Sequence, residues 1–557
     1  MGFVILPPEG LILHGGTILT IDPGRPQVDA VAVIGARIAA VGTFDEVRAA
    51  VPPTTETIDI GDRTLVPGFV DAHNHYFATA EAFAGVEVRD VRSIDELVRR
   101  IDHRAERTPP GRWIRGAGLE WSTYTEGRPP SREDLDAVSR QHPILVEHVS
   151  GHAVLVNSAA LDLAGLRDDV RDPPGGSFDR DDRGRPTGIV RDTATGLVLG
   201  PSVDIGHHGP NFHVDVDPEE AIGYLRDAGP RYLAEGLTTI GDPQVTRREL
   251  TAYRDAHRLG LSGPRVTVLP LSSQLEEYEA IGLAGPIGDD RLRIAGMKFY
   301  TDGAITGGTA AFTDGLDADR SPGTFYHGPE VFGDLVGRAH RAGWQIAVHA
   351  MGDRAYDLYL DTLEAAFRER PPDDPRPRVE HGTYPTPAQQ RRMASLGVIP
   401  VTQPGSIREL GDVWVSRLGD RVHEAMPLRS WLGLGLRPAI SSDAFVQSYR
   451  PLDTISAACF RSTPSGLRIG PHHELTIEEA VRAHTLDAAH ALFLDDRLGS
   501  IEPGKLADLA VVDGELLSTS PERIGELEVW LTILDGRIVH DRRQRASDSA
   551  HARPADR

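Results

Sequence analysis

The sequence predicts an α/β fold, a (β/α)8 (TIM) barrel with a small β-sandwich domain formed by both termini and an inserted subdomain. Three observations lead to this prediction. Short apolar runs alternate with helix-like stretches through the middle of the chain, both ends consist of strand-like sequence, and the stretch at about 85–235 is too long for one βα crossover. A doubly wound sheet is the alternative for the middle, and eight successive apolar runs favour the barrel.

The strand-like sequence at the two ends predicts one composite domain. Its apolar runs are 11–22, 29–43, 507–513 and 529–540. Turn sequences at 35–37 and at Asp535-Gly536 are typical of β-hairpins. We therefore expect residues 1–67 and 490–545 to form the β-sandwich domain. The polar, aperiodic stretch 546–557 is expected to be a disordered tail.

The middle of the chain, residues 68–489, is expected to form the barrel. Its apolar runs are 68–75, 236–242, 265–270, 295–303, 344–353, 378–384, 397–404 and 437–443. Helix-like stretches such as 328–343 and 354–370 lie between the runs, and this alternation is typical of parallel βαβ units. The insert at about 85–235 contains a loop rich in Pro, Gly and Asp at 173–188, and we interpret it as a subdomain or lid.

Polar side chains stand at or near the ends of several of these runs. In chain order they are His73, His75, Lys298, His349, His381 and Asp443. The C-terminal ends of barrel strands meet at one mouth, and residues two apart on a strand face the same side, so His73 and His75 can point at one ion. Imidazole and carboxylate ligands without thiolates suit zinc, manganese, iron or nickel. A lone H-x-H pair is weak, but this series of polar strand ends predicts a divalent metal site.

Composition excludes several other classes of protein. A net charge of −23, from 59 basic and 82 acidic residues, argues against nucleic acid or an anionic membrane as the main partner. The one cysteine, Cys459, excludes an intramolecular disulfide and a multi-cysteine metal site. The sequence shows no run of about 18 apolar residues and no signal peptide, which predicts a cytoplasmic protein. The partner expected in place of nucleic acid or membrane is a small-molecule substrate. The sequence leaves the oligomeric state open, with a homodimer as one candidate.

Lysine is almost absent, because Lys298 and Lys505 are the only two lysines among the 59 basic residues. A coding bias towards arginine explains the ratio, but Lys298 also ends a predicted strand among the histidines. Lys505 follows Pro503-Gly504 and is predicted to be a surface residue of a turn. Five further histidines are predicted to lie in solvated loops without a role: His207, His208, His213, His472 and His473.

Several segments resemble those of a known family. They are VPGFVDAHNH (66–75), GHAVLVNSAAL (151–161), GGSFDRDDRGRPTGIVRD (175–192), MKFYTDGAITGGTAAF (297–312), VHAMGDRAYD (348–357), VEHGTY (379–384), SSDAF (441–445) and LGSIEPGKLADLAVVD (498–513). With the order H-x-H, Lys, His, His, Asp, they make the chain similar to the amidohydrolase superfamily of metal-dependent hydrolases over roughly residues 10 to 540. Within it, the segments resemble the YtcJ-like, or amidohydrolase 3, group, to which N-substituted formamide deformylases belong.

The resemblance implies roles for the histidines and the aspartate. His73 and His75 would hold the more buried metal, and Asp443 would be both a ligand and the proton shuttle. His349 and His381 would hold a second metal or, in a one-metal variant, support the first. One or two divalent ions are therefore expected, with zinc as the leading candidate.

Lys298 takes the place at which many superfamily members carry an N6-carboxylysine, whose carbamate oxygens bridge two ions; whether it is carboxylated is left open. Asp443, Lys298 and His381 are the expected catalytic residues. The residues expected to bind substrate are His152, Glu120, Trp121, Asp302 and Gln403. Asp302 and Asp353 could also orient the ligating histidines, and Asp353 could instead cap a helix.

The predicted activity is hydrolysis of a carbon–nitrogen bond other than a peptide bond, in a linear amide such as an N-substituted formamide. A metal-activated hydroxide would be the nucleophile. A deaminase or a cyclic-amide hydrolase of the same superfamily is the alternative. A non-catalytic barrel that binds or assembles with a partner is the alternative from another class, and the complete set of ligand residues argues against it.

Overall fold

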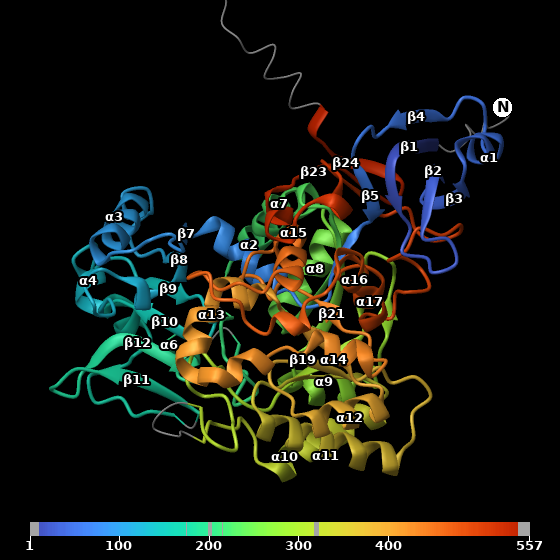
Figure 1. Ribbon diagram of the computed structural model, residues 1–557. Helices are drawn as coiled ribbons and strands as arrows, with labels where there is room; N and C mark the ends of the chain where they lie inside the picture. The colour runs from blue at the N-terminus through green and yellow to red at the C-terminus, as the bar shows by residue number, and fades with distance from the viewer. Residues whose placement is uncertain (1–9, 174, 199–202, 214–215, 317–321, 544–557) are drawn as a thin grey trace, which may run out of the picture.

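The computed structural model describes residues 10–173, 175–198, 203–213, 216–316 and 322–543. Its strands form an eight-stranded sheet, a six-stranded sheet and two five-stranded sheets. In Figure 1 the first two lie on opposite sides of the central parallel strands and their helices. The predicted tail, 546–557, lies outside the described residues.

The central sheets consist of parallel strands, apart from β15 (Ile287–Gly288), which pairs antiparallel with β16. The parallel strands are β6 (Phe69–Asp71), β13 (Leu237–Val245), β14 (Arg265–Pro270), β16 (Leu292–Ile294), β17 (Gly296–Tyr300), β18 (Gln345–His349), β19 (Arg378–His381), β20 (Ile399–Thr402) and β21 (Ala439–Ile440). Each of the predicted apolar runs of the middle contains or overlaps one of them.

Two junctions connect the central sheets. β16 and β17 are separated by Ala295 alone; β16 pairs with β14, and β17 pairs with β18, so this broken strand belongs to both sheets. At the other junction, the Asp443 amide donates to the His73 carbonyl over 2.8 Å, and the His75 amide donates to the Ala444 carbonyl over 2.7 Å. The loops after β6 and β21, which carry three predicted metal ligands, are thereby fixed against each other.

Helices alternate with these strands in the chain. They are α2 (Tyr76–Ala84), α7 (Pro218–Ala234), α8 (Arg247–Arg258), α9 (Leu275–Ala280), α10 (Pro329–Arg341), α11 (Asp353–Glu369), α12 (Pro387–Leu396), α13 (Gly405–Leu418), α14 (Leu428–Gly433), α15 (Pro451–Cys459), α16 (Ile477–Ala483) and α17 (Leu486–Ala491). The helices predicted at 328–343 and 354–370 are confirmed as α10 and α11. Along α11 the buried Tyr356, Tyr359, Leu360 and Leu363 share one face at helical spacing, which holds the helix against the central core.

Both ends of the chain contribute to the eight-stranded sheet. Its order is β24 (Arg537–Asp541), β23 (Val529–Leu534), β22 (Leu509–Val512), β5 (Thr64–Pro67), β1 (Gly10–Leu19), β2 (Gln27–Ile34) and β3 (Arg37–Gly42), with β4 (Glu56–Asp59) paired to β1. The antiparallel pair β5–β22 joins the two ends. The sequence predicts a sandwich of two sheets, whereas these strands form one hydrogen-bonded series. It buries Leu13 and Val511 in one core and Val47 of α1 (Phe44–Ala49) in another.

Arg265 connects this sheet to the parallel strands. It begins β14, is buried, and donates to Asp508 over 2.6 and 2.9 Å and also to Asp535. We expect Arg265→Ala to lower the free energy of unfolding by about 3–5 kcal/mol, because it leaves the buried Asp508 carboxylate without its partner. Denaturant unfolding measures this loss. Arg254→Ala removes an exposed pair with Asp255 and should lower it by at most about 1 kcal/mol; equal losses would contradict this interpretation.

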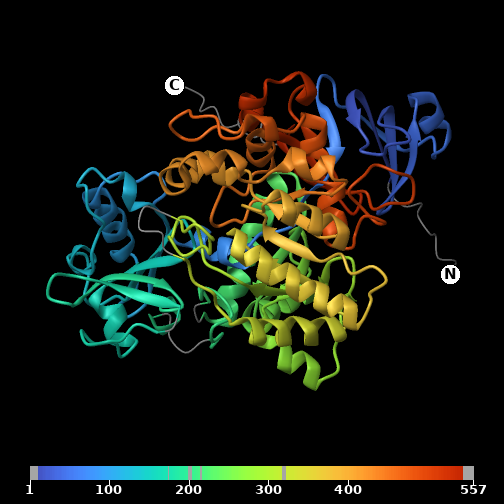
Figure 2. The same cartoon turned by 60° about the horizontal axis from the view of Figure 1, so that its bottom comes forward.

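The predicted insert contains the six-stranded sheet. Its order is β11 (Gly176–Arg180), β12 (Pro186–Asp192), β10 (Ala153–Val156), β9 (Ile144–His148), β8 (Ile114–Leu119) and β7 (Val86–Glu87), accompanied by α3 (Ile94–Ala105), α4 (Arg132–Asp136), α5 (Ser158–Leu163) and α6 (Thr195–Val198). The sheet buries two apolar cores of its own. It forms a lobe beside the central strands in both views (Figures 1 and 2). The later helix α7 packs instead on α2 and α8.

None of the helices in the described part of the chain combines the length and the apolar content that crossing a bilayer requires.

Candidate active site

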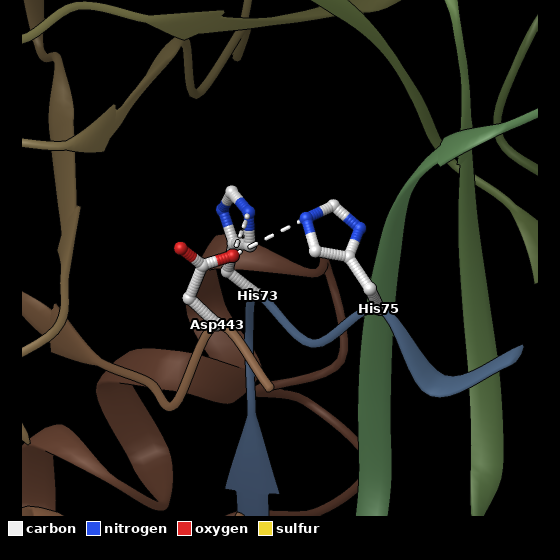
Figure 3. Close-up of side chains that lie close together, drawn as sticks. All are labelled: His73, His75 and Asp443. Atoms are coloured by element: carbon white, nitrogen blue, oxygen red, sulfur yellow. Dashed lines mark ion pairs between the residues drawn. The ribbon is translucent and has the colours of Figure 1, made fainter. Parts of the chain in front are cut away.

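Three predicted ligands meet at the junction of β6 and β21. The Nε2 atoms of His73 and His75 lie 3.3 and 3.2 Å from one oxygen, Oδ1, of Asp443. Figure 3 shows the two imidazoles and the carboxylate pointing toward one another. All three side chains are buried. Two ligands of a tetrahedral zinc ion, each bound at about 2.1 Å, are roughly 3.4 Å apart, so the spacing fits a single cation.

In both histidines, the hydrogen bond made by Nδ1 determines the tautomer of the ring. Nδ1 of His73 lies 2.5 Å from Oε2 of Glu380, and Nδ1 of His75 lies 3.2 Å from the carbonyl oxygen of Pro243. Both Nδ1 atoms therefore carry the proton and donate it, and both Nε2 lone pairs face Asp443. Nε2 of His73 and Oδ1 of Asp443 are buried without a hydrogen-bond partner among the described residues. Unpaired buried acceptors are costly, and a divalent cation is the group that this donor set fits.

Glu380 supports the site and was not singled out by the sequence. It is buried and accepts hydrogen bonds from Arg378 over 2.7 and 2.9 Å as well as from His73. Burial alone would raise the pKa of its carboxyl group, but Arg378 and His73 lower the pKa well below its usual range. In β19 the sequence Arg-Val-Glu places Arg378 and Glu380 on one face of the strand. This spacing is the only local sign in the sequence that the two side chains pair.

We expect Glu380→Gln to weaken metal binding about 10- to 100-fold, because the amide replaces the negative charge that holds the His73 imidazole in the ligating tautomer. Competition for zinc with a chelator measures this affinity. Glu364→Gln, at a carboxylate that pairs with Arg392 outside the site, is the matched control and should bind zinc as the wild type does. Unchanged affinity in Glu380→Gln would exclude this orienting role.

His349 and His381 end the neighbouring parallel strands β18 and β19, whereas Lys298, which was predicted at a strand end, lies in the middle of β17. The ring centroid of His381 is 4.9 Å from that of His73 and 4.5 Å from that of His349. Nζ of Lys298 is fully buried 4.7 Å from the Tyr300 ring centroid, and it makes no hydrogen bond within the described ranges. Burial lowers the pKa of Lys298 to about 8.

Hydrogen bonds also set the tautomers of these two histidines. Nε2 of His349 lies 3.1 Å from the Gly303 carbonyl oxygen and therefore donates, which leaves the buried Nδ1 as the acceptor. Ser441 donates to the Thr402 carbonyl and accepts from Nε2 of Gln403, so Oε1 of Gln403 faces Nδ1 of His381 at 3.0 Å. His381 thus donates from Nδ1 and keeps its lone pair on Nε2, as a metal ligand requires.

Four of the nine described non-glycine residues with positive φ lie in or beside this region. His381 and Asp443 have φ angles of 71° and 53°, and Gln244 and Asp192 have 65° and 47°. Residues with a side chain rarely adopt this left-handed conformation, and each instance costs on the order of 1–3 kcal/mol unless the surrounding structure holds it. The hydrogen bonds of Asp443 and Gln403 described above hold two of these loops in place.

A cavity of about 160 Å³ lies between the insert and the loops of the central strands, and several predicted substrate residues line it. They are Glu120, Trp121 and His152, with His148 and Asp192 beside them. Nδ1 of His152 lies 2.8 Å from Oδ1 of Asp192, and its ring centroid is 6.1 Å from that of His349. The insert therefore places His152 next to His349, one of the predicted metal ligands.

Asp302 and Gln403 have different surroundings. Asp302 is buried and accepts backbone N–H groups of Ala311, Met351 and Gly352 over 2.8–3.0 Å, with one oxygen 3.8 Å from Nε2 of His349. These contacts indicate that Asp302 holds the loops around His349 in place. Gln403 contacts His381 as described. Asp353 is the first residue of α11 behind the N-cap Gly352, so it is not the cap that the sequence allowed.

Three predictions of solvated positions are wrong. His213 is buried, with Nδ1 3.0 Å from Oε1 of Glu249, and His473 is buried as well. Lys505 is largely buried, because Nζ donates to the Asp495 carbonyl and to the Ser500 hydroxyl, each over 2.6 Å. For His213 and Lys505, hydrogen-bond partners 5 to 36 positions away in the sequence bind a side chain whose local sequence is polar.

Comparison with known proteins identifies the family. Residues 56–540 match the family model described as the amidohydrolase family. The chain belongs to the amidohydrolase family. The family confirms the predicted enzyme class, a hydrolase that acts on carbon–nitrogen bonds. The chain is 33% identical to an N-substituted formamide deformylase from Arthrobacter pascens, over 96% of this chain and 98% of that protein. It is 28% identical to the YtcJ protein of Bacillus subtilis, over 95% and 99%.

Two solved structures of metal-dependent hydrolases show the same fold. An uncharacterized metal-dependent hydrolase from Pyrococcus furiosus is 26% identical, with a TM-score of 0.72 over 91% of this chain and 100% of that one. A second, from Pyrococcus horikoshii, gives a TM-score of 0.75 at 24% identity over 92% and 99%. The insert and the terminal sheet therefore belong to an architecture that these proteins share along nearly their whole length.

Proposed function

We propose that this amidohydrolase hydrolyses the carbon–nitrogen bond of a linear amide such as an N-substituted formamide, with one or two divalent ions, zinc first among them. The observation that carries the proposal is the buried meeting point of His73, His75 and Asp443, where Nε2 of His73 and Oδ1 of Asp443 have no other described partner. The choice of substrate class is supported by the 33% identity to the Arthrobacter deformylase.

We propose that residues 68–489 form a closed (β/α)8 barrel. The broken strand β16–β17 and the hydrogen bonds between the loops after β6 and β21 support closure on both sides. We assign residues 1–67 and 490–545 to the composite β domain and about 85–235 to the insert. The position of α7 on α2 supports ending the insert's own fold before residue 218.

A bound ion would supply a hydroxide at neutral pH by lowering the pKa of water to about 7. His73, His75 and Asp443 would hold this ion, and His349, His381 and Lys298 offer a ligand set for a second. In the tautomer described above, Nε2 of His381 carries a lone pair and no proton, so it can bind an ion but cannot donate a hydrogen bond to the substrate carbonyl. We therefore propose that His381 acts in catalysis as a metal ligand, through Nε2.

Asp443 moves the proton in this proposal. Burial raises the pKa of its carboxyl group, but His73, His75 and His381 lower it more strongly, so the pKa lies well below the usual value and the group is a carboxylate at neutral pH. Its oxygen Oδ1 lies 3.3 and 3.2 Å from Nε2 of His73 and Nε2 of His75, so the carboxylate would lie beside a water held by the same ion. Asp443 can take the proton from that water and deliver it to the leaving nitrogen.

Lys298 is proposed to carry a carboxyl group on Nζ. A pKa of about 8 leaves part of the amine neutral at physiological pH, and the neutral amine is the form that attacks CO2. The Nζ–C bond forms, the nitrogen loses a proton, and an anionic carbamate replaces a cation. An unmodified ammonium beside a divalent ion would be unfavourable, and the unpartnered position of Nζ supports the modification.

A substrate panel tests the function. Zinc-loaded protein is given N-substituted formamides, longer acyl amines, cyclic ureas and amidines, and aminated heterocycles, and each product is measured. We expect the highest kcat/KM for the formamides. Turnover of the cyclic compounds alone, or release of ammonia from the heterocycles alone, would replace the proposal by a cyclic-amide hydrolase or a deaminase. No turnover of any class by metal-loaded protein would favour the non-catalytic alternative.

A further inference from the structure

A second group of metal-ligand side chains lies outside the active-site residues. Glu424, His472 and His473 each offer one ligand atom, and these atoms lie within 4.8 Å of one another. Nε2 of His472 is 3.6 Å from Oε1 of Glu424, and Nε2 of His473 is 3.6 Å from Oε2. The separation of roughly 3.4 Å expected for two ligands around a tetrahedral zinc ion is close to both distances.

His473 is buried and has ring nitrogens without hydrogen bonds, as His73 has at Nε2 in the active site. Its side chain is 3% exposed, and neither Nδ1 nor Nε2 forms a hydrogen bond within the described ranges. A buried imidazole without a hydrogen bond is unusual and destabilising. Burial, Arg461 and His472 together lower the pKa of His473 to about 3, so its ring is neutral and retains the lone pair that a metal needs.

The other two ligands are accessible to an ion. The side chains of Glu424 and His472 are 64% and 55% exposed. They can therefore adjust to a coordination geometry while the buried His473 stays fixed. The resulting set of two imidazoles and one carboxylate leaves at least one position of a tetrahedral ion for water.

Buried contacts hold the two backbone segments of the cluster together. The segments are η3 (Gly419–Glu424) and η4 (Pro471–His473). Arg461 donates from one guanidinium to the carbonyl oxygens of Ala425 and Met426 after η3 and of Ile469 before η4. The Gly470 amide also donates to Nδ1 of His423 over 3.1 Å. The ligand-bearing segments are thus positioned before any ion arrives, which reduces the entropy lost on binding.

We propose that Glu424, His472 and His473 bind a divalent cation of the zinc, nickel or copper type. Imidazole and carboxylate ligands select these ions over calcium or magnesium, which prefer oxygen ligands alone. This site is separate from the ligand set of the active site and does not depend on the proposed function.

Zinc binding by His73→Ala protein tests the proposal, because that variant lacks an active-site ligand. Zinc per chain is measured by mass spectrometry after equilibrium dialysis, in His73→Ala and in the double variants with His472→Ala or Glu424→Gln. We expect each double variant to lose one further equivalent. Zinc should also raise the unfolding temperature of His73→Ala but not that of the double variants. Both added substitutions are at exposed positions, so folding is preserved.

His257→Ala in the same background is the matched control, because it removes an exposed histidine that pairs with Asp289 and lies outside both ligand sets. It should retain the zinc that His73→Ala retains. Equal zinc in His73→Ala and both double variants would overturn the second site. Equal zinc in the wild type and His73→Ala, with a loss only in the double variants, would instead contradict the active-site ligands while supporting this one.

Discussion

Asp443→Asn is expected to lower kcat/KM on the best amide of the panel by roughly 10²–10⁴-fold, the usual loss for a general acid–base residue. The amide is nearly isosteric, so the fold and the strained backbone at residue 443 are retained, but it cannot accept the proton of the attacking water. It is also a poorer ligand than the carboxylate, because it has no charge to offset that of the ion. Steady-state kinetics with excess zinc separates the proton-transfer effect from weakened metal binding.

The control is Asp255→Asn, at an exposed carboxylate that pairs with Arg254. It should have the kcat/KM of the wild type. A decrease of Asp443→Asn activity that excess zinc fully restores would show that Asp443 is a ligand only. Wild-type kinetics without added zinc would remove Asp443 from the mechanism.

Lys298→Met is expected to lower activity without lowering the free energy of unfolding. Metal-free wild-type protein holds an amine at Nζ that is buried without a described partner. Replacing such a group by an apolar side chain of similar volume is neutral or raises the free energy of unfolding by about 1–4 kcal/mol. Turnover should nevertheless fall by about 10- to 100-fold or more, because loss of an indirect metal contact alone typically costs about 10- to 100-fold. Denaturant unfolding of metal-free protein and steady-state kinetics are the two measurements.

Lys298→Arg is the companion variant. It keeps the charge but overfills a fully buried position, so we expect both stability and activity to fall. The carbamate has its own spectroscopic test, because protein equilibrated with ¹³C-bicarbonate should show a carbamate carbon signal that Lys298→Met lacks. Full turnover in Lys298→Met would exclude Lys298 from the chemistry, and turnover lost without any carbamate signal would leave it a structural role beside the metal.

Local sequence patterns predict the strand ends of this protein well. The runs that carry His73, Lys298, His349, His381 and Asp443 all contain parallel strands, because an apolar run of this length followed by a polar residue is a local property. Convergence of these residues then follows from parallel pairing. The broken strand at Ala295 and the single terminal sheet depend on long-range pairing and could not be read from periodicity.

The contacts that orient the site depend on partners far apart in the chain. Glu380 reaches His73 across 307 positions, and Gln403 fixes His381 through Ser441. Glu249 covers His213 from a later helix in the same way. Sequence spacing identifies which residue types are present near a strand end, but only the packed structure determines which nitrogen of each histidine remains free for an ion.

The most direct test of the metal centre is anomalous diffraction on crystals of zinc-loaded, catalytically active protein, with data collected on both sides of the zinc absorption edge. We predict a zinc peak at about 2.0–2.2 Å from Nε2 of His73, Nε2 of His75 and an oxygen of Asp443. Zinc peaks elsewhere in the same active protein, with none between these three atoms, would contradict the proposed active site.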